Sequence, residues 1–191
     1  CVLAIEANPL LVSRFQERAR PLIENRVNTL NLGIVTTDEY KLGSAIPFYV
    51  NDNDVWSSFD EKMGCRDGSE YGQAFKCRSI HVPVTTCAKV INVCQRKPLY
   101  MKIDIENRDR ACIESLKHSS SLPKYISIEN NAETDLEILK SLGYKKFKLV
   151  NQTGFGGDSG PFGEHAIDVD YGLKWRTFEQ IKGAICNDGK P

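Results

Sequence analysis

Apolar and polar positions along the chain follow two alternating patterns, and these predict where strands and helices lie. Short apolar runs are typical of buried strands, while apolar residues that recur every three or four positions are typical of amphipathic helices. The first such helix has Asn8 as its cap and Pro9 at its first position, and it should bend or end near Pro21. Strands are expected at 1–6, 27–35, 45–50, 79–84, 99–105, 124–129 and 145–150, and further helices at 86–94, 108–118 and 133–142, the last closed by Gly143.

The order of these segments predicts the fold class. Apolar strands alternate with short helices through the second half of the chain, a pattern that favours a parallel sheet covered on both faces. We therefore expect an α/β fold with a Rossmann-like, doubly wound and mostly parallel sheet. A single domain should cover residues 1–186, with 187–191 as a tail, and two long loops are expected at 51–76 and at the glycine-rich stretch 151–165.

The beginning of the chain is apolar from its first residue and has no initiator methionine. Cys1 to Ile5 form a run typical of a buried parallel strand, and such strands are rarely the first element of a domain. We therefore expect that the sequence lacks an N-terminal segment of the natural protein.

Composition limits which binding partners and which cellular compartment are expected. The 191 residues include 25 basic and 25 acidic side chains without a long single-sign run, so neither nucleic acid nor an anionic membrane surface is the expected partner. No apolar stretch approaches the roughly 20 residues that span a bilayer. Seven cysteines, an odd number without a C-x-x-C pair, predict buried or free thiols in a reducing compartment and a cytoplasmic location.

Glu6 is the first candidate site residue, because it ends a strand immediately before a helix. In doubly wound folds, a carboxylate at such a position can accept hydrogen bonds from both hydroxyls of a ribose. The glycine-rich turn that accompanies this carboxylate would lie about 20 residues upstream, before the start of this sequence. A solvent-facing glutamate favoured by the helix dipole is the structural alternative, and the sequence leaves both interpretations open.

Three further carboxylates, Asp104, Glu106 and Glu129, follow the ends of apolar strands. The carboxyl ends of parallel strands meet at one edge of a sheet, where doubly wound folds bind their ligands. Such a group of carboxylates suggests a site that handles a proton or a cation. The alternative is helix capping, or ion pairing with Lys102, Arg108 or Arg110.

Several stretches together resemble the FkbM-type methyltransferases, class I enzymes that use S-adenosylmethionine. They are VLAIEANP, VPVTT, PLYMKIDIENRDRACIESL, PKYISIE, LKSLGYKKFKLVNQ and SGPFGE, in the order of the family and over nearly the whole chain. The resemblance implies O-methylation of a small-molecule or saccharide hydroxyl, without a required metal. It implies that Glu6 holds the ribose of the cofactor, with Asn8 as a further cofactor-binding residue, and that the strand around Asn31, Leu32 and Gly33 passes near the adenine. It also implies that Asp104, with Glu106 and Glu129 as further candidates, serves as the catalytic base.

The chain departs from that family at identifiable positions. The first strand and the glycine loop of the family would precede Cys1, Asn107 stands where the family usually has glycine, and TTCAKVI replaces a more usual leucine and acidic pair. Asparagine tolerates a left-handed conformation better than most residues, so the turn at Asn107 can survive. Two other interpretations stay open: a nicotinamide-dependent oxidoreductase, and a non-catalytic Rossmann-like binding domain.

Overall fold

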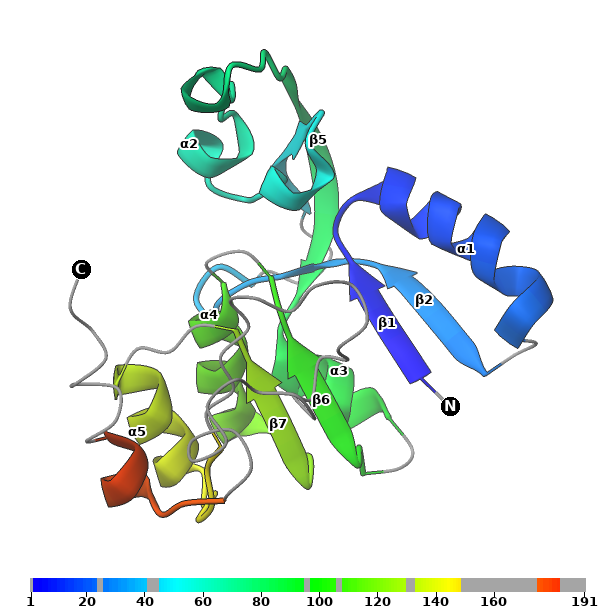
Figure 1. The fold of residues 1–191 in the computed structure, drawn as a ribbon. Helices are drawn as coiled ribbons and strands as arrows, with labels where there is room; N and C mark the ends of the chain where they lie inside the picture. The colour runs from blue at the N-terminus through cyan, green and yellow to red at the C-terminus, as the bar shows by residue number, and fades with distance from the viewer. Residues whose placement is uncertain are drawn as a thin grey trace. The chain divides into compact units, whose positions relative to one another are not determined.

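The chain forms two compact units, Cys1–Glu129 and Asn130–Pro191, which we describe separately. The computed structural model in Figure 1 describes residues 2–23, 26–40, 45–94, 97–105, 108–129, 133–148 and 175–182. Within that part of the chain, no helix combines the length and the apolar character needed to cross a membrane.

The first unit begins with a strand, a helix and a second strand, as the sequence predicts, but the strand expected at 27–35 ends at Asn31, and residues 33–34 pair in another sheet. β1 (Val2–Glu6) pairs in parallel with β2 (Val27–Asn31), and α1 (Pro9–Ile23) connects them. Asn8 caps α1, because its Oδ1 accepts a hydrogen bond from the backbone N–H of Leu10 at 3.0 Å. The helix continues just past Pro21 and ends at Ile23.

A three-stranded sheet in the order β3-β5-β4 comes next. β3 (Gly33–Ile34) is parallel to β5 (Cys77–Thr85), whereas β4 (Ala45–Asn51) is antiparallel to β5 over its full length. One face of this sheet carries a small core, made of the buried side chains Phe48, Val50 and Val82 with Ala7, Phe59 and Ile80 packed against them.

The segment between β4 and β5, residues 52–76, was expected to be a long loop but has structure of its own. This β4–β5 insertion contains η1 (Asp54–Trp56), α2 (Glu61–Gly64) and η2 (Ser69–Tyr71). Trp56 packs against Tyr71 and Phe75, with ring centroids 5.9 and 5.3 Å away, and the Arg66 guanidinium lies over its ring. These helices are too short to produce a periodic sequence pattern, which is why the pattern predicted a loop.

The last part of the first unit alternates helices and strands. In order it contains α3 (Cys87–Val93), β6 (Tyr100–Ile103), α4 (Asp109–Ser115), η3 (Leu116–His118) and β7 (Tyr125–Ile128). β6 and β7 are parallel, with Tyr100 opposite Tyr125 and Ile103 opposite Ile128. These strands and helices match the segments predicted from sequence to within a few residues.

Two disulfides correct the prediction of free thiols. Cys65 and Cys77 join the end of α2 to the start of β5, and Cys87 and Cys112 join α3 to α4. Among the described cysteines, only Cys94 is free. Spacing along the sequence did not reveal these pairs, because each depends on which segments become neighbours in the fold.

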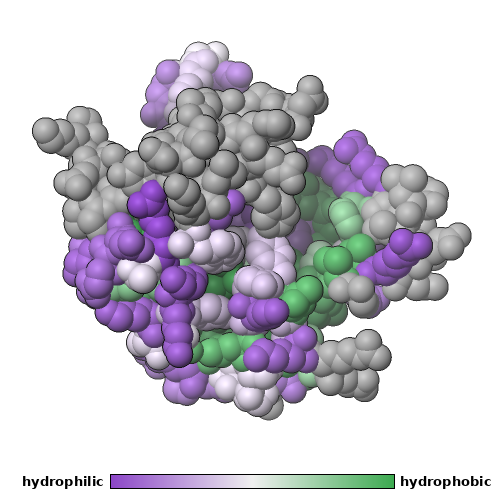
Figure 2. Space-filling view, turned by 60° about the horizontal axis from the view of Figure 1, so that its bottom comes forward, coloured by the Kyte–Doolittle hydropathy of each residue, from purple (hydrophilic) through white to green (hydrophobic). Residues whose placement is uncertain are grey.

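The sheet arrangement also corrects the predicted fold. The α/β class is confirmed, but the described strands form separate sheets of two, three and two strands rather than one continuous parallel sheet. Within the described residues β1 pairs only with β2, and β6 only with β7, so no strand connects the two pairs. Large apolar and aromatic side chains are exposed on these strands and beside them: Val2, Leu3, Leu30, Leu99, Tyr100 and Tyr125. Figure 2 shows green, hydrophobic areas at the surface on one face of the molecule.

The second unit contains α5 (Glu133–Ser141), and helical residues 178–182. Gly143 follows α5 with a φ of 100°, a conformation that glycine adopts easily, as predicted for the end of this helix. Instead of a strand at 145–148, only Phe147 forms a bridge, to Arg176. Residues 149–150, the predicted loop 151–165 and the predicted tail 187–191 lie outside the described residues.

Candidate functional site

Asp104 and Glu129 lie next to each other at the carboxyl ends of β6 and β7. They follow the last paired residues, Ile103 and Ile128, by one position each. The Glu129 side chain is near enough to Asp104 to act as a hydrogen-bond partner that lowers the pKa of Asp104. The sequence correctly predicted that these two carboxylates meet, whereas Glu106 lies outside the described residues.

Lys102 lowers the pKa of Asp104. Its ammonium forms an ion pair with Asp104, and the hydrogen bond from Lys102 is the main reason that the pKa of Asp104 is lowered. Partial burial acts in the opposite direction, and the hydrogen bond with Glu129 lowers the pKa of Asp104 further. The hydrogen bond to Asp104 in turn raises the pKa of Lys102, although burial opposes it. Asp104 is therefore ionised at neutral pH.

The same face of β6 and β7 carries more polar groups than the sequence argument used. Strand residues two positions apart share a face, which places Tyr100 beside Lys102, and Ser127 beside Glu129. The Tyr100 hydroxyl and the Ser127 Oγ are 2.6 Å apart in a hydrogen bond. This polar face ends in an exposed carboxylate, which can accept a hydrogen bond from a hydroxyl group and take up its proton.

Glu6 lies at the carboxyl end of β1 and is tied to the start of α1. Its Oε1 accepts a hydrogen bond from the backbone N–H of Asn8 at 2.7 Å. Its carbonyl oxygen accepts hydrogen bonds from Asn31 Nδ2 at 2.9 Å and from the backbone N–H of Leu32 at 3.2 Å. The strand end that carries Glu6 is thereby fixed to the end of β2.

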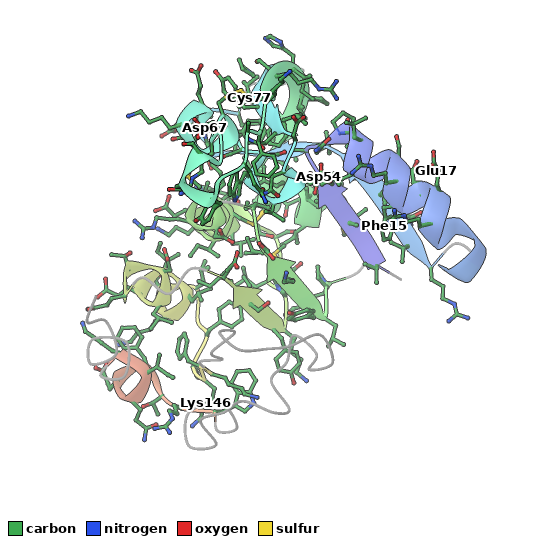
Figure 3. The ribbon with its side chains drawn as sticks, turned by 45° about the horizontal axis from the view of Figure 1, so that its top comes forward. Phe15, Glu17, Asp54, Asp67, Cys77 and Lys146 are labelled. Carbon is green, nitrogen blue, oxygen red and sulfur yellow. A yellow bond between two sulfur atoms is a disulfide. The ribbon has the colours of Figure 1, made fainter. Side chains whose placement is uncertain are left out.

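Burial is the largest influence on the Glu6 carboxyl and raises its pKa. Hydrogen bonds from the backbone N–H groups of Asn8 and Ala7 act against this effect, and the negative charge of Asp54 adds to it. Asp54 itself pairs with Arg14 of α1 at 2.6 Å, and Figure 3 shows Asp54 close to the beginning of this helix. Glu6 is thus a half-buried carboxyl whose charge is costly without a further donor.

The residues around Glu6 fit the ribose of a nucleotide cofactor in part. Asn8 is fully buried, and its Nδ2 has no hydrogen-bond partner in the described part of the chain. A buried donor of this kind costs free energy until a ligand or water satisfies it. The Glu6 carboxylate could therefore accept a hydrogen bond from one ribose hydroxyl, and the Asn8 amide could donate one to the other.

Leu32 and Gly33, the two residues assigned to the adenine, are partly or fully buried. Leu32 is half-buried, and Gly33 is buried with the Phe59 ring directly over the side on which a side chain would project. Phe59 also packs edge-on against Phe48, with ring centroids 4.9 Å apart. A ligand next to Gly33 would therefore meet the Phe59 ring, a neighbour that the sequence pattern did not indicate.

A second charged pair, Arg108 and Glu39, connects the segment after β3 to the start of α4, and sequence reasoning missed it. Arg108, just before α4, donates to Glu39 at 2.8 and 2.6 Å, and its guanidinium lies 5.6 Å from the centroid of the Phe59 ring. Burial raises the pKa of Glu39, but hydrogen bonds from Arg108 and Thr36 outweigh that effect and lower it. The residues are 69 positions apart, so no local pattern connects them.

No protein-family model matches the chain, and no curated protein or solved structure is significantly similar to it. Within the described residues, no group of three or more histidine, cysteine, aspartate or glutamate side chains has an arrangement that could hold a metal ion. The family resemblance in the sequence motifs therefore stays a prediction, and function is inferred from the site geometry together with those motifs.

Proposed function

We propose that this chain belongs to an S-adenosylmethionine-dependent methyltransferase that methylates a hydroxyl group of a small molecule or saccharide. The observation that carries the proposal is the position of Asp104 and Glu129, side by side at the carboxyl ends of two parallel strands, with Lys102 paired to Asp104. Doubly wound proteins bind ligands at such strand ends. The motifs that resemble the FkbM family include this same strand.

Asp104 would orient the acceptor hydroxyl and receive its proton as the oxygen is alkylated. When bound, S-adenosylmethionine supplies a methyl group on a sulfonium, which is already a good leaving group. The ion pair with Lys102 keeps Asp104 ionised and makes it a weak base. A weak base suffices, because the acceptor oxygen becomes strongly acidic as its bond to carbon forms.

Glu6 and Asn8 would bind the cofactor through its ribose hydroxyls, since one supplies a carboxylate and the other an unsatisfied buried N–H group. A nicotinamide cofactor carries the same diol, and this geometry also suits an oxidoreductase. Thermal denaturation with each cofactor separates the two, because a ligand that binds the folded protein raises its melting temperature. Stabilisation by NAD or NADP instead of S-adenosylmethionine would favour the oxidoreductase.

The two disulfides also bear on where the protein acts. Disulfides persist mainly in secreted proteins and in oxidising compartments, and they are rare in the cytosol. With Cys65–Cys77 and Cys87–Cys112 both formed, we propose an oxidising compartment in place of the cytoplasm expected from the sequence.

The test of the catalytic assignment is Asp104→Asn in the full-length protein. This change keeps the shape of the side chain and removes its charge and basicity. Turnover should fall by about 10²- to 10⁴-fold, the usual contribution of a general base, while the melting temperature stays nearly unchanged. The measurement is transfer of a labelled methyl group from S-adenosylmethionine to hydroxyl-bearing acceptors.

Glu17→Gln is the matched control, because Glu17 is an exposed carboxylate of α1 that projects into solvent in Figure 3. It should leave turnover unchanged. Normal turnover in Asp104→Asn would refute the role of this carboxylate, and a loss found only in Glu129→Gln would transfer the role to the neighbouring strand. No methyl transfer by the unaltered protein, with no stabilisation by either cofactor, would favour a non-catalytic binding domain.

A further inference from the structure

A depression of about 550 Å³ that is open to solvent, called the cavity below, lies between the β4–β5 insertion and the start of α4, within the first unit. Its size is within the range of small-molecule sites. Tyr49 of β4, Phe59 between β4 and α2, Glu61 of α2 and Arg108 just before α4 line it, together with Ser58, Asp60 and Lys62. Phe59 also covers Gly33, whereas the other lining residues lie outside the Asp104 and Glu6 groups.

The walls of this cavity are held in place by the protein itself. Tyr49 and Ser58 exchange two backbone hydrogen bonds, at 2.9 and 3.0 Å, which fold the insertion back over β4. Asp60 caps α2 by accepting hydrogen bonds from the backbone N–H groups of Lys62 and Met63 at 2.8 and 3.2 Å. The Cys65–Cys77 disulfide fixes the other end of α2. A pocket that is already formed loses little conformational entropy when a ligand enters.

The lining offers hydrogen-bond donors and acceptors around one aromatic ring. The Tyr49 hydroxyl donates to Glu61 Oε2 at 3.4 Å, a long hydrogen bond that a ligand hydroxyl can replace on either side. The Ser58 hydroxyl, the Glu61 carboxylate and the Lys62 ammonium add donors and acceptors, and the half-buried Phe59 ring adds an apolar surface.

The charges of the lining exclude several classes of ligand. Asp60 and Glu61 oppose Lys62 and Arg108, so the formal charges cancel. Glu39 already engages Arg108, which leaves little attraction for a phosphate. A fatty chain would leave the charged side chains desolvated and unpaired. A neutral ring that carries hydroxyl groups on its edge and C–H bonds on its face satisfies both the polar groups and the aromatic ring.

We propose that this cavity, between the β4–β5 insertion and α4, binds a neutral saccharide, whose hydroxyl groups contact Tyr49 and Glu61 and whose ring packs on Phe59. Arg108 of the cavity wall follows Asp104 by only four residues in the sequence. The assignment of this saccharide as the methyl acceptor rests on the proposed methyltransferase function. Binding of the saccharide does not.

Binding is tested by saturation-transfer NMR of the full-length protein without cofactor, using the methyl glycosides of glucose, galactose and mannose as probes. Tyr49→Phe removes a hydroxyl group and Glu61→Gln replaces a charged acceptor oxygen by an amide nitrogen, and both keep the side-chain shape. Each should raise the dissociation constant for the glycoside by about tenfold, the effect of losing one hydrogen bond that involves a charged group. Glu70→Gln is the control, because Glu70 is an exposed residue of the same insertion and pairs with Arg66 outside the cavity.

Saturable binding that both cavity variants weaken and the control preserves would support the proposal. Absence of saturable binding by all three glycosides would overturn it, and so would binding that neither cavity variant alters. Binding of AMP or choline that depends on Tyr49 and Glu61, without binding of the glycosides, would overturn the saccharide class.

The two proposals fail in different ways. Glycoside binding without methyl transfer would support the saccharide site and refute its role as the acceptor site. Methyl transfer to an aromatic hydroxyl, without glycoside binding, would support the methyltransferase and overturn the saccharide site.

Discussion

The Cys87–Cys112 disulfide should contribute a large share of the stability of the first unit. It joins α3 to α4 across 25 positions of sequence, and both cysteines are almost fully buried, at 5% and 1% exposure. Around it, the backbone N–H of Ala88 donates to Ser115 Oγ at 3.2 Å, so the two helices are also connected by a buried hydrogen bond. The perturbation is the double variant Cys87→Ala and Cys112→Ala, which avoids the buried hydroxyl that serine would introduce.

The expected magnitude follows from the length of chain that the disulfide closes. A loop of this size restricts the unfolded chain by about 3.5 kcal/mol in the chain-entropy account. The Cys65–Cys77 disulfide closes only 12 positions, and its removal should cost about 2.8 kcal/mol in the same account. For a unit of this size, removal of the Cys87–Cys112 disulfide corresponds to a fall in melting temperature of roughly 10–15 °C.

The assay is urea denaturation followed by circular dichroism, with the Cys65→Ala and Cys77→Ala double variant measured in parallel. Peptide mapping under non-reducing conditions should recover both linked peptide pairs from the unaltered protein. Mild reduction should open Cys65–Cys77 first, because Cys77, which is labelled in Figure 3, is exposed to solvent, whereas Cys87 and Cys112 are buried. Equal urea midpoints for the Cys87–Cys112 variant and the unaltered protein would refute the reasoning, as would the recovery of unlinked Cys87 and Cys112 peptides.

Three further changes test other parts of the site. Glu6→Gln should weaken S-adenosylmethionine binding about tenfold in calorimetry by removing a charged hydrogen-bond acceptor, and an unchanged dissociation constant would return Glu6 to a structural role. Because the pKa of Asp104 is lowered, this group stays ionised from pH 8 to pH 5, and any stability it contributes is lost only as the pH falls through its lowered pKa. Turnover that falls near pH 6 in the unaltered protein but not in Asp104→Asn would contradict this. Gly33→Ala should lower the free energy of unfolding by about 1–3 kcal/mol, since the added methyl group meets the Phe59 ring, and a neutral result in urea denaturation would mean that Phe59 moves away easily.

The sequence predicted those parts of the fold that depend on neighbouring residues. Asn8 followed by Pro9 marked the start of α1, and the positions of Asp104 and Glu129 after consecutive apolar strands predicted that they meet. Both inferences need only local geometry and the rule that parallel strands end at the same edge.

Other features depend on contacts between distant residues, and the sequence did not reveal them. The Arg108–Glu39 pair spans 69 positions, and the Phe59 ring covers Gly33 through a chain reversal that no periodic pattern encodes. The separation into three sheets depends on which strand edges are paired, a property that apolar character alone does not determine. Cysteine spacing likewise gave no indication of either disulfide.

The β4–β5 insertion leaves and re-enters the hairpin at one point, because Asn51 and Cys77 are paired across the two strands. Its length and sequence can therefore change during evolution without altering the register of β4 and β5. The cavity takes Phe59, Asp60, Glu61 and Lys62 from this insertion, whereas Asp104 and Glu129 lie on other strands. If the two proposals hold, ligand preference and proton transfer can be selected independently, and related chains could diversify in what they recognise while keeping the same chemistry.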